Sequence, residues 1–187
     1  MLRVRNYFAI FTAVFYKPEK AFRLAAGHEE GARKLFYYYG LPLLVVASTG
    51  RMMAHTAGAG DWLASLTVFL INFCAYSVAI FLGAYLVSRL AVPFRSISDR
   101  SLTLKLIVIA FTPFLVSQPL TAISTGMRVL GFLALAYTFV LFGVGLKPML
   151  QTPPSKASGY SLVAFFILLG IAWVVNLVLS GLFIIVF

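Results

Sequence analysis

Acidic and metal-binding side chains are scarce in this sequence of 187 residues. Its five Asp and Glu residues all lie outside the long apolar stretches, which argues against a transporter that relays protons through carboxylates inside a membrane. Its two histidines, His28 and His55, are separated by an apolar stretch, and the sequence has no HExxH motif and no cysteine cluster. We therefore predict no metal site and no cofactor.

Cysteine and catalytic motifs are equally sparse. The single cysteine, Cys74, excludes an intrachain disulfide, and we expect it to be a small buried packing residue. Ser48 lies near His55 in the sequence, but there is no G-x-S-x-G motif and no buried acid to orient the histidine. The sequence thus predicts no catalytic residues and argues against an enzyme.

Charge is also low for a soluble protein, because 11% of the residues are charged, 61% are hydrophobic and the mean hydropathy is +0.98. Soluble domains carry roughly a quarter charged residues. Only helices and closed barrels satisfy the backbone inside a bilayer, and the apolar runs have the length of helices. The composition therefore predicts an all-α integral membrane protein with no room for a separate soluble catalytic domain.

Apolar stretches without charge account for most of the chain, and each is close to the ~20 residues that a helix needs to cross a bilayer. The first reaches this length only when Arg51 is included, with its side chain extending to the interface. The apolar run from Tyr7 to Tyr16 has no small-residue cleavage site after it, so we expect it to be retained. We predict a cytoplasmic amphipathic segment over residues 1–34 and a five-helix transmembrane domain over residues 35–187, with spans at approximately 35–53, 62–88, 106–127, 129–146 and 157–187.

The Lys and Arg residues are distributed unevenly between the loops. Thirteen of the fifteen precede the first span or fall in the loops after the second and fourth spans, and Arg51 and Arg128 are the other two. Cytoplasmic loops are enriched in Lys and Arg, so the pattern predicts a cytoplasmic N-terminus and an outer C-terminus. The net charge of +10 then indicates orientation and an affinity for anionic lipid headgroups at the cytoplasmic face, rather than nucleic acid binding.

The N-terminal segment has a helical pattern of its own. Apolar residues recur at helical spacing from Val4 to Phe15, which predicts a short helix in the membrane interface with its Phe face in lipid. Pro18 fits the first turn of a second helix, and Gly27 is placed to end it. These helices could simply cover the bundle, or they could form a partner surface. The residues of that surface would be Phe8, Phe11, Phe15, Lys20 and Arg23.

Proline and amide side chains are the notable features within the spans. Pro113 and Pro119 each remove a backbone hydrogen bond, which predicts a bent or locally unwound third span. With the predicted helix directions, Asn72, Gln118 and Asn176 lie at a similar depth, slightly outward of the span midpoints. The three amides could hydrogen-bond as a layer that holds the helices together, or they could form a polar site for a small ligand or a lipid headgroup.

Small residues recur every four positions in two of the spans. They are Ala75, Ala79 and Gly83 in the second span, and Ala172, Asn176 and Ser180 in the fifth. Such stripes let helix backbones approach closely. We therefore predict that the second and fifth spans form a closely packed pair.

Several short motifs occur in an order that resembles a known family. They are Pro18 with Ala21-Phe22, Thr112-Pro113 in the third span, Gly145-Leu146-Lys147 at the end of the fourth, and Lys156-Ala157 at the start of the fifth. Over roughly Tyr7 to Phe183 the chain is similar to the Yip family, the Ypt/Rab-interacting membrane proteins and their prokaryotic relatives. The resemblance implies a five-helix bundle with a cytosolic N-terminus and an outer or lumenal C-terminus.

The resemblance also bears on function. In eukaryotes the family is implicated in membrane traffic and organisation through contacts with Rab-type GTPases and other family members. This chain lacks a long cytoplasmic N-terminal extension, which favours the compact prokaryotic form in the cell inner membrane. A small GTPase partner and a Golgi or ER location are expected only for a eukaryotic-like member.

Two functions remain open on these grounds. The first is a non-enzymatic, membrane-organising scaffold that binds lipids and proteins, with a second copy of the chain or another membrane protein as its partner. The alternative is a small transporter or channel that uses the broken third span and the three amides.

Overall fold

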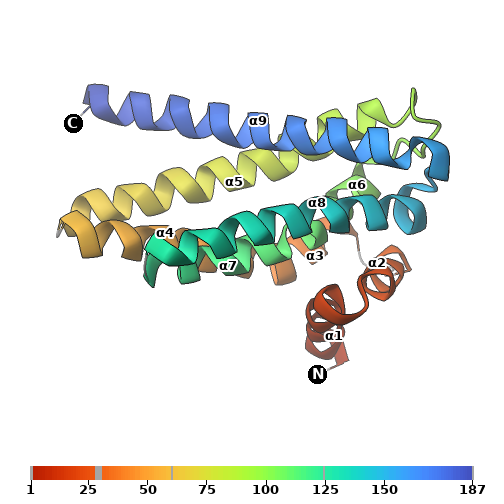
Figure 1. Cartoon of the computed structure of the whole chain (residues 1–187), viewed down its shortest axis with the longest axis horizontal. Coiled ribbons are helices and arrows are strands. Elements are labelled where there is room, and N and C mark those ends of the chain that lie inside the picture. The colour runs from red at the N-terminus through yellow and green to blue at the C-terminus, as the bar shows by residue number, and fades with distance from the viewer. Residues whose placement is uncertain (1, 28–30, 60, 124, 187) are drawn as a thin grey trace.

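The computed structural model describes residues 2–27, 31–59, 61–123 and 125–186, and all its elements over these residues are helices (Figure 1). His28 lies outside the described residues. The prediction of an all-α protein is thus confirmed. The elements in order are α1 (Leu2–Tyr16), α2 (Pro18–Ala26), α3 (Ala32–Leu35), the π-helical turn η1 (Phe36–Gly40), α4 (Leu41–Ala59), α5 (Trp62–Leu90), α6 (Arg100–Ala110), α7 (Thr112–Ile123), the 3-10 turn η2 (Thr125–Met127), α8 (Arg128–Leu150) and α9 (Pro154–Val186).

Within the described ranges, four candidate membrane spans are long and apolar enough to cross a bilayer. They are α5, the segment Arg100–Thr121 formed by α6 and α7, α8, and α9. They correspond to the predicted second to fifth spans. The third begins six residues before the predicted start at residue 106, because the Asp99 carboxylate accepts hydrogen bonds from the backbone N–H groups of Ser101 (2.6 Å) and Leu102 (3.2 Å) and so caps α6.

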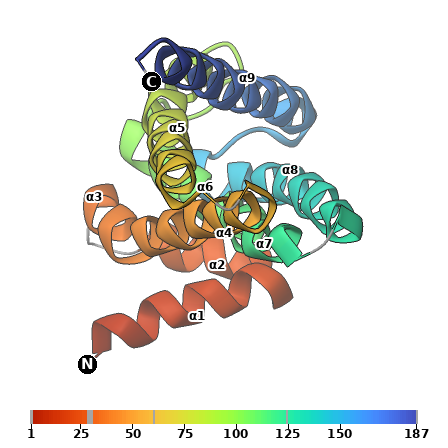
Figure 2. The same ribbon diagram turned by 90° about the vertical axis from the view of Figure 1, so that its left-hand side faces the viewer.

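A further long helix is formed by α3, η1 and α4, which follow one another without interruption from Ala32 to Ala59. It carries Arg51 and His55, is less apolar than the other four and does not qualify as a span by length and composition. It lies lengthwise beside α5 and α7 and makes its main contacts with them (Figures 1 and 2). The predicted first span, residues 35–53, therefore falls inside a longer helix.

Successive long helices alternate in direction along the long axis of the molecule (Figure 1). In that view α4, α7 and α9 end at the left, whereas α5 and α8 end at the right, where the loops of residues 91–99 and 151–153 lie. The N-terminal helices α1 and α2 pack toward the right-hand half, and α1 runs across the bundle axis rather than along it (Figure 2).

The segment formed by α6 and α7 is the centre of the bundle. In its most apolar window 72% of the residues are buried, against 11% in α9, whose surface is left for contact with lipid. Every residue from Thr103 to Ala110 is buried, because α6 packs against α2, α5 and α8 and contacts α3 and η1. From Leu106 to Ala110 the helix is apolar on all sides, as expected where a helix is covered on all sides.

The third span is interrupted at Phe111, two residues before Pro113. Proline lacks the N–H that a regular helix needs, and the break follows from that loss. Thr112, next to the break, is buried, and its hydroxyl lies 2.8 Å from the hydroxyl of Tyr39 on η1. At Pro119 the expected unwinding does not occur, because α7 continues through it.

The start of α9 is fixed to the end of α5. The buried Tyr160 hydroxyl donates to the carbonyl of Val87 at 2.8 Å, and the Tyr160 ring stacks on Phe94 at a centroid distance of 4.8 Å. The Lys156 ammonium donates to the carbonyl of Pro93 at 2.9 Å. These bonds hold the loops of residues 91–99 and 151–153 side by side.

Candidate functional site

Basic side chains gather at one end of the molecule. Arg51, in the last turns of α4, and Arg128, at the start of α8, lie at the other end. We call the two ends the basic end and the opposite end. The described Lys and Arg side chains of the basic end are Lys17, Lys20, Arg23, Arg33, Lys34, Arg89, Arg95, Arg100, Lys105, Lys147 and Lys156.

Helix α2 is anchored to the basic end by its apolar face. Phe22 and Ala25 are fully buried, and Phe22 packs where α8 has Gly145. A Cβ at Gly145 would come within 2.9 Å of the Phe22 ring and would also clash with Leu106 of α6, so the glycine lets three helices meet. The buried Lys105 ammonium donates to the Ala25 carbonyl at 3.1 Å, at the C-terminal end of α2, where the helix dipole favours a cation.

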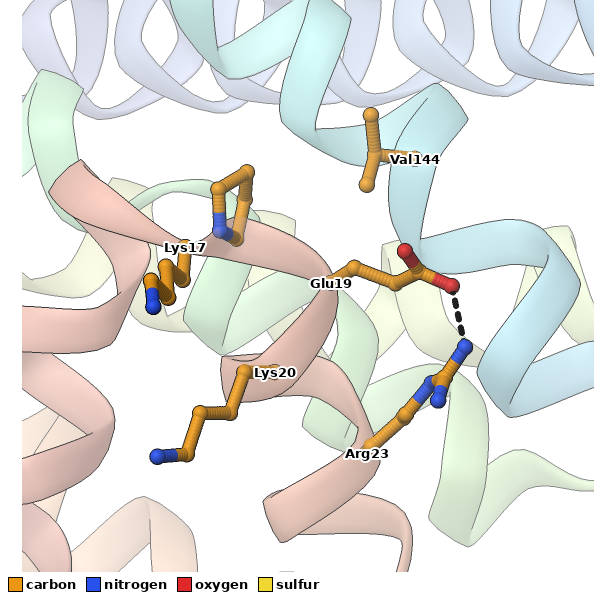
Figure 3. A pocket seen from close by; sticks show the side chains of 6 residues that line it. Lys17, Glu19, Lys20, Arg23 and Val144 are labelled. Atoms are coloured by element: carbon orange, nitrogen blue, oxygen red, sulfur yellow. Dashed lines mark hydrogen bonds and ion pairs between the residues drawn. The ribbon is translucent and has the colours of Figure 1, made fainter.

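The outer side of α2 borders an open hollow of about 560 Å³ (Figure 3). Glu19 pairs with Arg23 at 2.6 Å, one helical turn away, so the charge of Arg23 is compensated. Lys17 and Lys20 extend away from this pair in Figure 3, and neither meets a carboxylate among the described residues. The hollow is lined by Lys17, Pro18, Glu19, Lys20, Arg23 and Val144.

A second hollow, of about 530 Å³, lies between the start of α3 and the start of α6. Arg33 and Arg100 line it together with Ser101, Leu104 and Phe81, and both arginines are exposed. Neither arginine forms an ion pair within the described part of the chain. Its lining also includes Gly31 and Ala32.

A third hollow continues along α5 from the second and shares Phe81 and Arg100 with it. The guanidinium groups of Arg89 and Arg100 lie over the Tyr85 ring, at 5.3 and 5.7 Å from its centroid. The other lining residues are Ser77, Val78 and Leu82. Guanidinium groups bind phosphate, and an apolar strip below them suits an acyl chain, so the two hollows together have the chemistry of an anionic lipid site.

Helix α1 presents the predicted Phe face outward in part. Phe8 is 66% exposed and Phe15 is 40% exposed, whereas Phe11 is partly buried and meets the Phe15 ring edge-on at 5.6 Å. The other side of α1 packs on the bundle through three buried residues, Tyr7, Ile10 and Val14. The Tyr137 hydroxyl of α8 donates to the Val14 carbonyl at 3.0 Å and fixes the end of α1.

The three predicted amides are not brought together. The Asn72 amide donates to the carbonyl of Val68 at 2.8 Å, and the Gln118 amide donates to the carbonyl of Phe114 at 3.3 Å, so each bonds to its own helix. No hydrogen bond joins Asn72, Gln118 and Asn176 to one another in the part of the chain that the structure describes. Gln118 instead lines a hollow at the opposite end, and the lining of that hollow includes neither Asn72 nor Asn176.

The predicted pairing of the second and fifth spans is present, since α5 and α9 pack against each other. A Cβ at Gly83 would clash with Leu168 of α9, which marks the close approach. In α9 the predicted residues Ala172 and Ser180 are only partly buried, because the two helices diverge toward the opposite end (Figure 1). In α5 the whole stripe is buried, at Ala75, Ala79 and Gly83.

The expectation of a buried cysteine is wrong, because Cys74 is exposed on α5. The faces of α5 that contact α4, α6 and α9 bury Asn72 and Ala75, and Cys74 points away from them. The residues around Cys74 are apolar on every side of the helix, so the sequence gives no signal for which side is covered.

His55 pairs with a serine other than Ser48. Its Nδ1 lies 3.0 Å from the Oγ of Ser65, which donates to the carbonyl of Asp61 at 2.7 Å. The Ser65 hydroxyl thus contacts both the Asp61 carbonyl and the His55 ring. This contact ties α4 to α5. Among the described residues no group of three His, Cys, Asp or Glu side chains is placed to hold a metal ion.

Gly50 is a contact residue that the sequence interpretation overlooked. A Cβ there would lie 2.5 Å from the Cα and N of Pro119, so α4 and α7 touch backbone to backbone. Ala54 follows Gly50 by four residues, which is the same small-residue pattern that predicted the α5 contact. Applying that pattern to the first span would have found this contact.

Comparison with known families gives one result that covers most of the chain. The model of the Yip1 domain matches residues 12–176. No match is found among the curated proteins or among the solved structures. The matched region runs from within α1 to within α9 and so includes α2, the hollows of the basic end and the candidate spans.

Proposed function

Because this match extends over most of its length, the chain belongs to the Yip1 domain family, and we propose that it is a non-enzymatic scaffold that organises membranes by binding lipids and proteins. The family and the apolar helices together make it a multi-pass membrane protein. The finer features of the proposal concern its topology, its lipid contacts and its protein contacts.

The proposed topology has five spans, with the N-terminus in the cytoplasm and the C-terminus outside. The span added to the four candidates is the first in the chain, the continuous helix of α3, η1 and α4, which is about 40 Å long at about 1.5 Å per residue and lies beside two candidate spans. The basic end then faces the cytoplasm, since cytoplasmic segments are enriched in Lys and Arg. We propose the cell inner membrane as its location.

The observation that carries the proposal is the set of uncompensated cations at the basic end. Lys17 and Lys20 border one hollow, and Arg33 and Arg100 border another. Each Lys or Arg near an anionic membrane surface contributes about 1 kcal/mol of attraction. We infer that these hollows hold anionic lipid headgroups, with an acyl chain along Tyr85 and its neighbours on α5.

The proposed protein-binding surface is the exposed side of α1 and α2. Phe8 and Phe15 offer aromatic surface, Phe11 supports them, and Lys20 and Arg23 supply charge beside them. Partner classes that fit this surface are another membrane protein or a second copy of the chain. A small GTPase belongs to the proposal only for a eukaryotic-like member.

The proposal is tested by purifying the chain from membranes in a mild detergent and identifying the lipids and proteins that accompany it. Each substitution in Lys17→Gln/Lys20→Gln removes about 1 kcal/mol of attraction, but only at one of several proposed lipid sites. We therefore expect the ratio of anionic to zwitterionic lipid that the double variant retains to fall about threefold. The double variant Lys34→Gln/Lys147→Gln has the same net charge and should change the ratio less, because these two side chains line none of the three hollows.

Protein partners are tested in the same purification. The double variant Phe8→Ser/Phe15→Ser should lose the co-purifying proteins while it keeps its lipids. Recovery of bulk lipid alone, in the same proportions for all variants and with no protein partner, would contradict the scaffold proposal.

The alternative, a small transporter or channel, has less support in the geometry. It relied on Asn72, Gln118 and Asn176 acting as one site, and they make no hydrogen bond to each other. A carrier should lose function in Gln118→Ala and Asn176→Leu variants, whereas a scaffold should keep its partners in both.

A further inference from the structure

The opposite end has a hollow of its own, of about 360 Å³, between α4, α5, α7 and α8. This volume is at the small end of the range for ligand sites, about 300–1,000 Å³, and suits a headgroup rather than a large molecule. The lining residues that bear on its chemistry are Arg51, Tyr76, Gln118, Arg128, Phe132 and Leu135.

The charge of this hollow is positive and uncompensated. Arg51 and Arg128 are far apart in the sequence, and the fold brings both to the same lining. No carboxylate is part of the lining, and neither arginine forms an ion pair within the described residues. Asp61, also at this end, caps the start of α5 by accepting from the backbone N–H of Leu63 at 2.9 Å. The hollow therefore favours an anion over a zwitterion whose cation would need an acceptor.

Polar groups beside the two arginines remain available to a ligand. The Tyr76 hydroxyl makes no hydrogen bond within the described part of the chain. Gln118 is buried, with 5% of its surface exposed. One N–H of its side-chain amide donates to the Phe114 carbonyl of its own helix, so the second N–H and the amide oxygen remain for a ligand. The Thr121 hydroxyl donates to the Gln118 carbonyl at 2.7 Å and keeps its lone pairs. Of these groups, the Tyr76 hydroxyl and the second Gln118 N–H can donate to phosphate and ester oxygens. The Gln118 oxygen and the Thr121 lone pairs can only accept, as from a glycerol hydroxyl of the headgroup.

The same hollow is continuous with the apolar surface of α8. Phe132 lines it and is 73% exposed, and its neighbours Val129 and Leu133 are each 60% exposed. A ligand can therefore enter sideways from the membrane and leave an apolar tail along α8. Free phosphate would leave the apolar half of the lining without a partner.

We propose that this hollow binds one anionic phospholipid, with its phosphate between Arg51 and Arg128 and its glycerol and upper acyl region against Phe132 and Leu135. Two guanidinium groups match the oxygens of a phosphate diester. The site is separate from the basic end and does not rest on the proposed scaffold function.

The test uses the full chain in phosphatidylcholine nanodiscs that contain a small fraction of phosphatidylglycerol with a photoactivatable diazirine high on one acyl chain. Cross-links are mapped by mass spectrometry of peptides. We expect labelling near Phe132 and Leu135 that exceeds, by about tenfold, the labelling by a diacylglycerol with the same diazirine, since a charge-assisted contact accounts for about that factor. Arg51→Gln/Arg128→Gln should lose about tenfold of this labelling, and Lys34→Gln/Lys147→Gln should retain it.

Labelling on α5 near Tyr85 reports lipid binding at the basic end in the same sample. Failure of the basic-end proposal is thereby distinguished from failure of this one. Equal labelling by the diacylglycerol probe, or full labelling of Arg51→Gln/Arg128→Gln, would overturn the proposal. Loss of labelling in excess inorganic phosphate would assign the hollow to a free anion and would also overturn it. If Arg51→Gln/Arg128→Gln fails to fold, the comparison of the two probes on the unaltered chain still decides.

Discussion

At the scale of single residues, glycines without room for a side chain determine where the helices of this bundle touch. Gly50, Gly83 and Gly145 each face atoms that a Cβ would strike, whereas Gly58 and Gly170 have nothing within 4 Å. Inside a membrane the hydrophobic effect does not draw helices together, so close packing has a larger share in their association. These three glycine contacts therefore contribute strongly to the association of the helices, although each is small in area.

We predict that Gly50→Ala lowers the stability of the bundle by about 1–3 kcal/mol, because the added methyl group meets the Pro119 backbone, which cannot rotate away. The measurement is the midpoint of thermal unfolding in detergent. Gly58→Ala, in the same helix, is the matched control and should be neutral or stabilising by up to about 1 kcal/mol, since alanine favours helix. Equal midpoints for the two variants would contradict the close contact of α4 and α7.

At the scale of elements, the N-terminal helices are part of the bundle rather than loose appendages. Motif residues that are far apart in the sequence, Phe22 and Gly145, meet where α2 docks, and Lys105 bonds the end of α2. The neighbouring prolines show the same dependence on context. Pro113 coincides with a helix break, while Pro119 stays helical against Gly50.

We predict that Gly145→Ala loosens α2, because the new methyl group strikes Phe22 and Leu106. Tryptic cleavage after Lys20 and Arg23 should accelerate by about fivefold, which corresponds to about 1 kcal/mol in the opening of α2. Gly143→Ala, two residues earlier, should cleave at the normal rate, because its Cβ would meet only Ser161 at 3.8 Å. An unchanged rate in Gly145→Ala would mean that Phe22 is not the anchor.

At the scale of the whole molecule, the alternating helix directions gather the basic side chains of distant segments at one end. Helix α2, the end of α5 with the loop of residues 91–99, the end of α8 and the start of α9 all contribute Lys or Arg to that end, and Arg51 and Arg128 are left at the other. An even number of spans would put the two chain termini on the same side of the membrane. Five spans put them on opposite sides.

We predict that a reporter fused after Phe187 is active outside the cytoplasm, whereas the same reporter inserted at Ile97, in the loop of residues 91–99, is active in the cytoplasm. Alkaline phosphatase and a fluorescent protein are suitable, because each is active on only one side. Three spans lie between these positions, so cytoplasmic activity at both would mean that one of them, α6–α7, α8 or α9, does not cross the bilayer. The helix of α3, η1 and α4 is tested by the fluorescent protein fused before Met1. Loss of its fluorescence there, with Ile97 still in the cytoplasm, would mean that this helix does not cross.

The sequence by itself determined the class of protein, the family resemblance, most helix positions and the uneven distribution of Lys and Arg between the loops. Hydropathy and charge are local properties, and insertion of each segment into a bilayer depends on that segment's own hydropathy and flanking charges. The sequence did not determine which side of an apolar helix is covered, and so Cys74 was misjudged and the amides were expected to meet. Only the tertiary structure decided that Arg51, Gln118 and Arg128 share one hollow, since that depends on how α4, α7 and α8 pack. The physical reason is that burial and proximity belong to pairs of helices, and a uniformly apolar helix does not encode its neighbours in its own pattern.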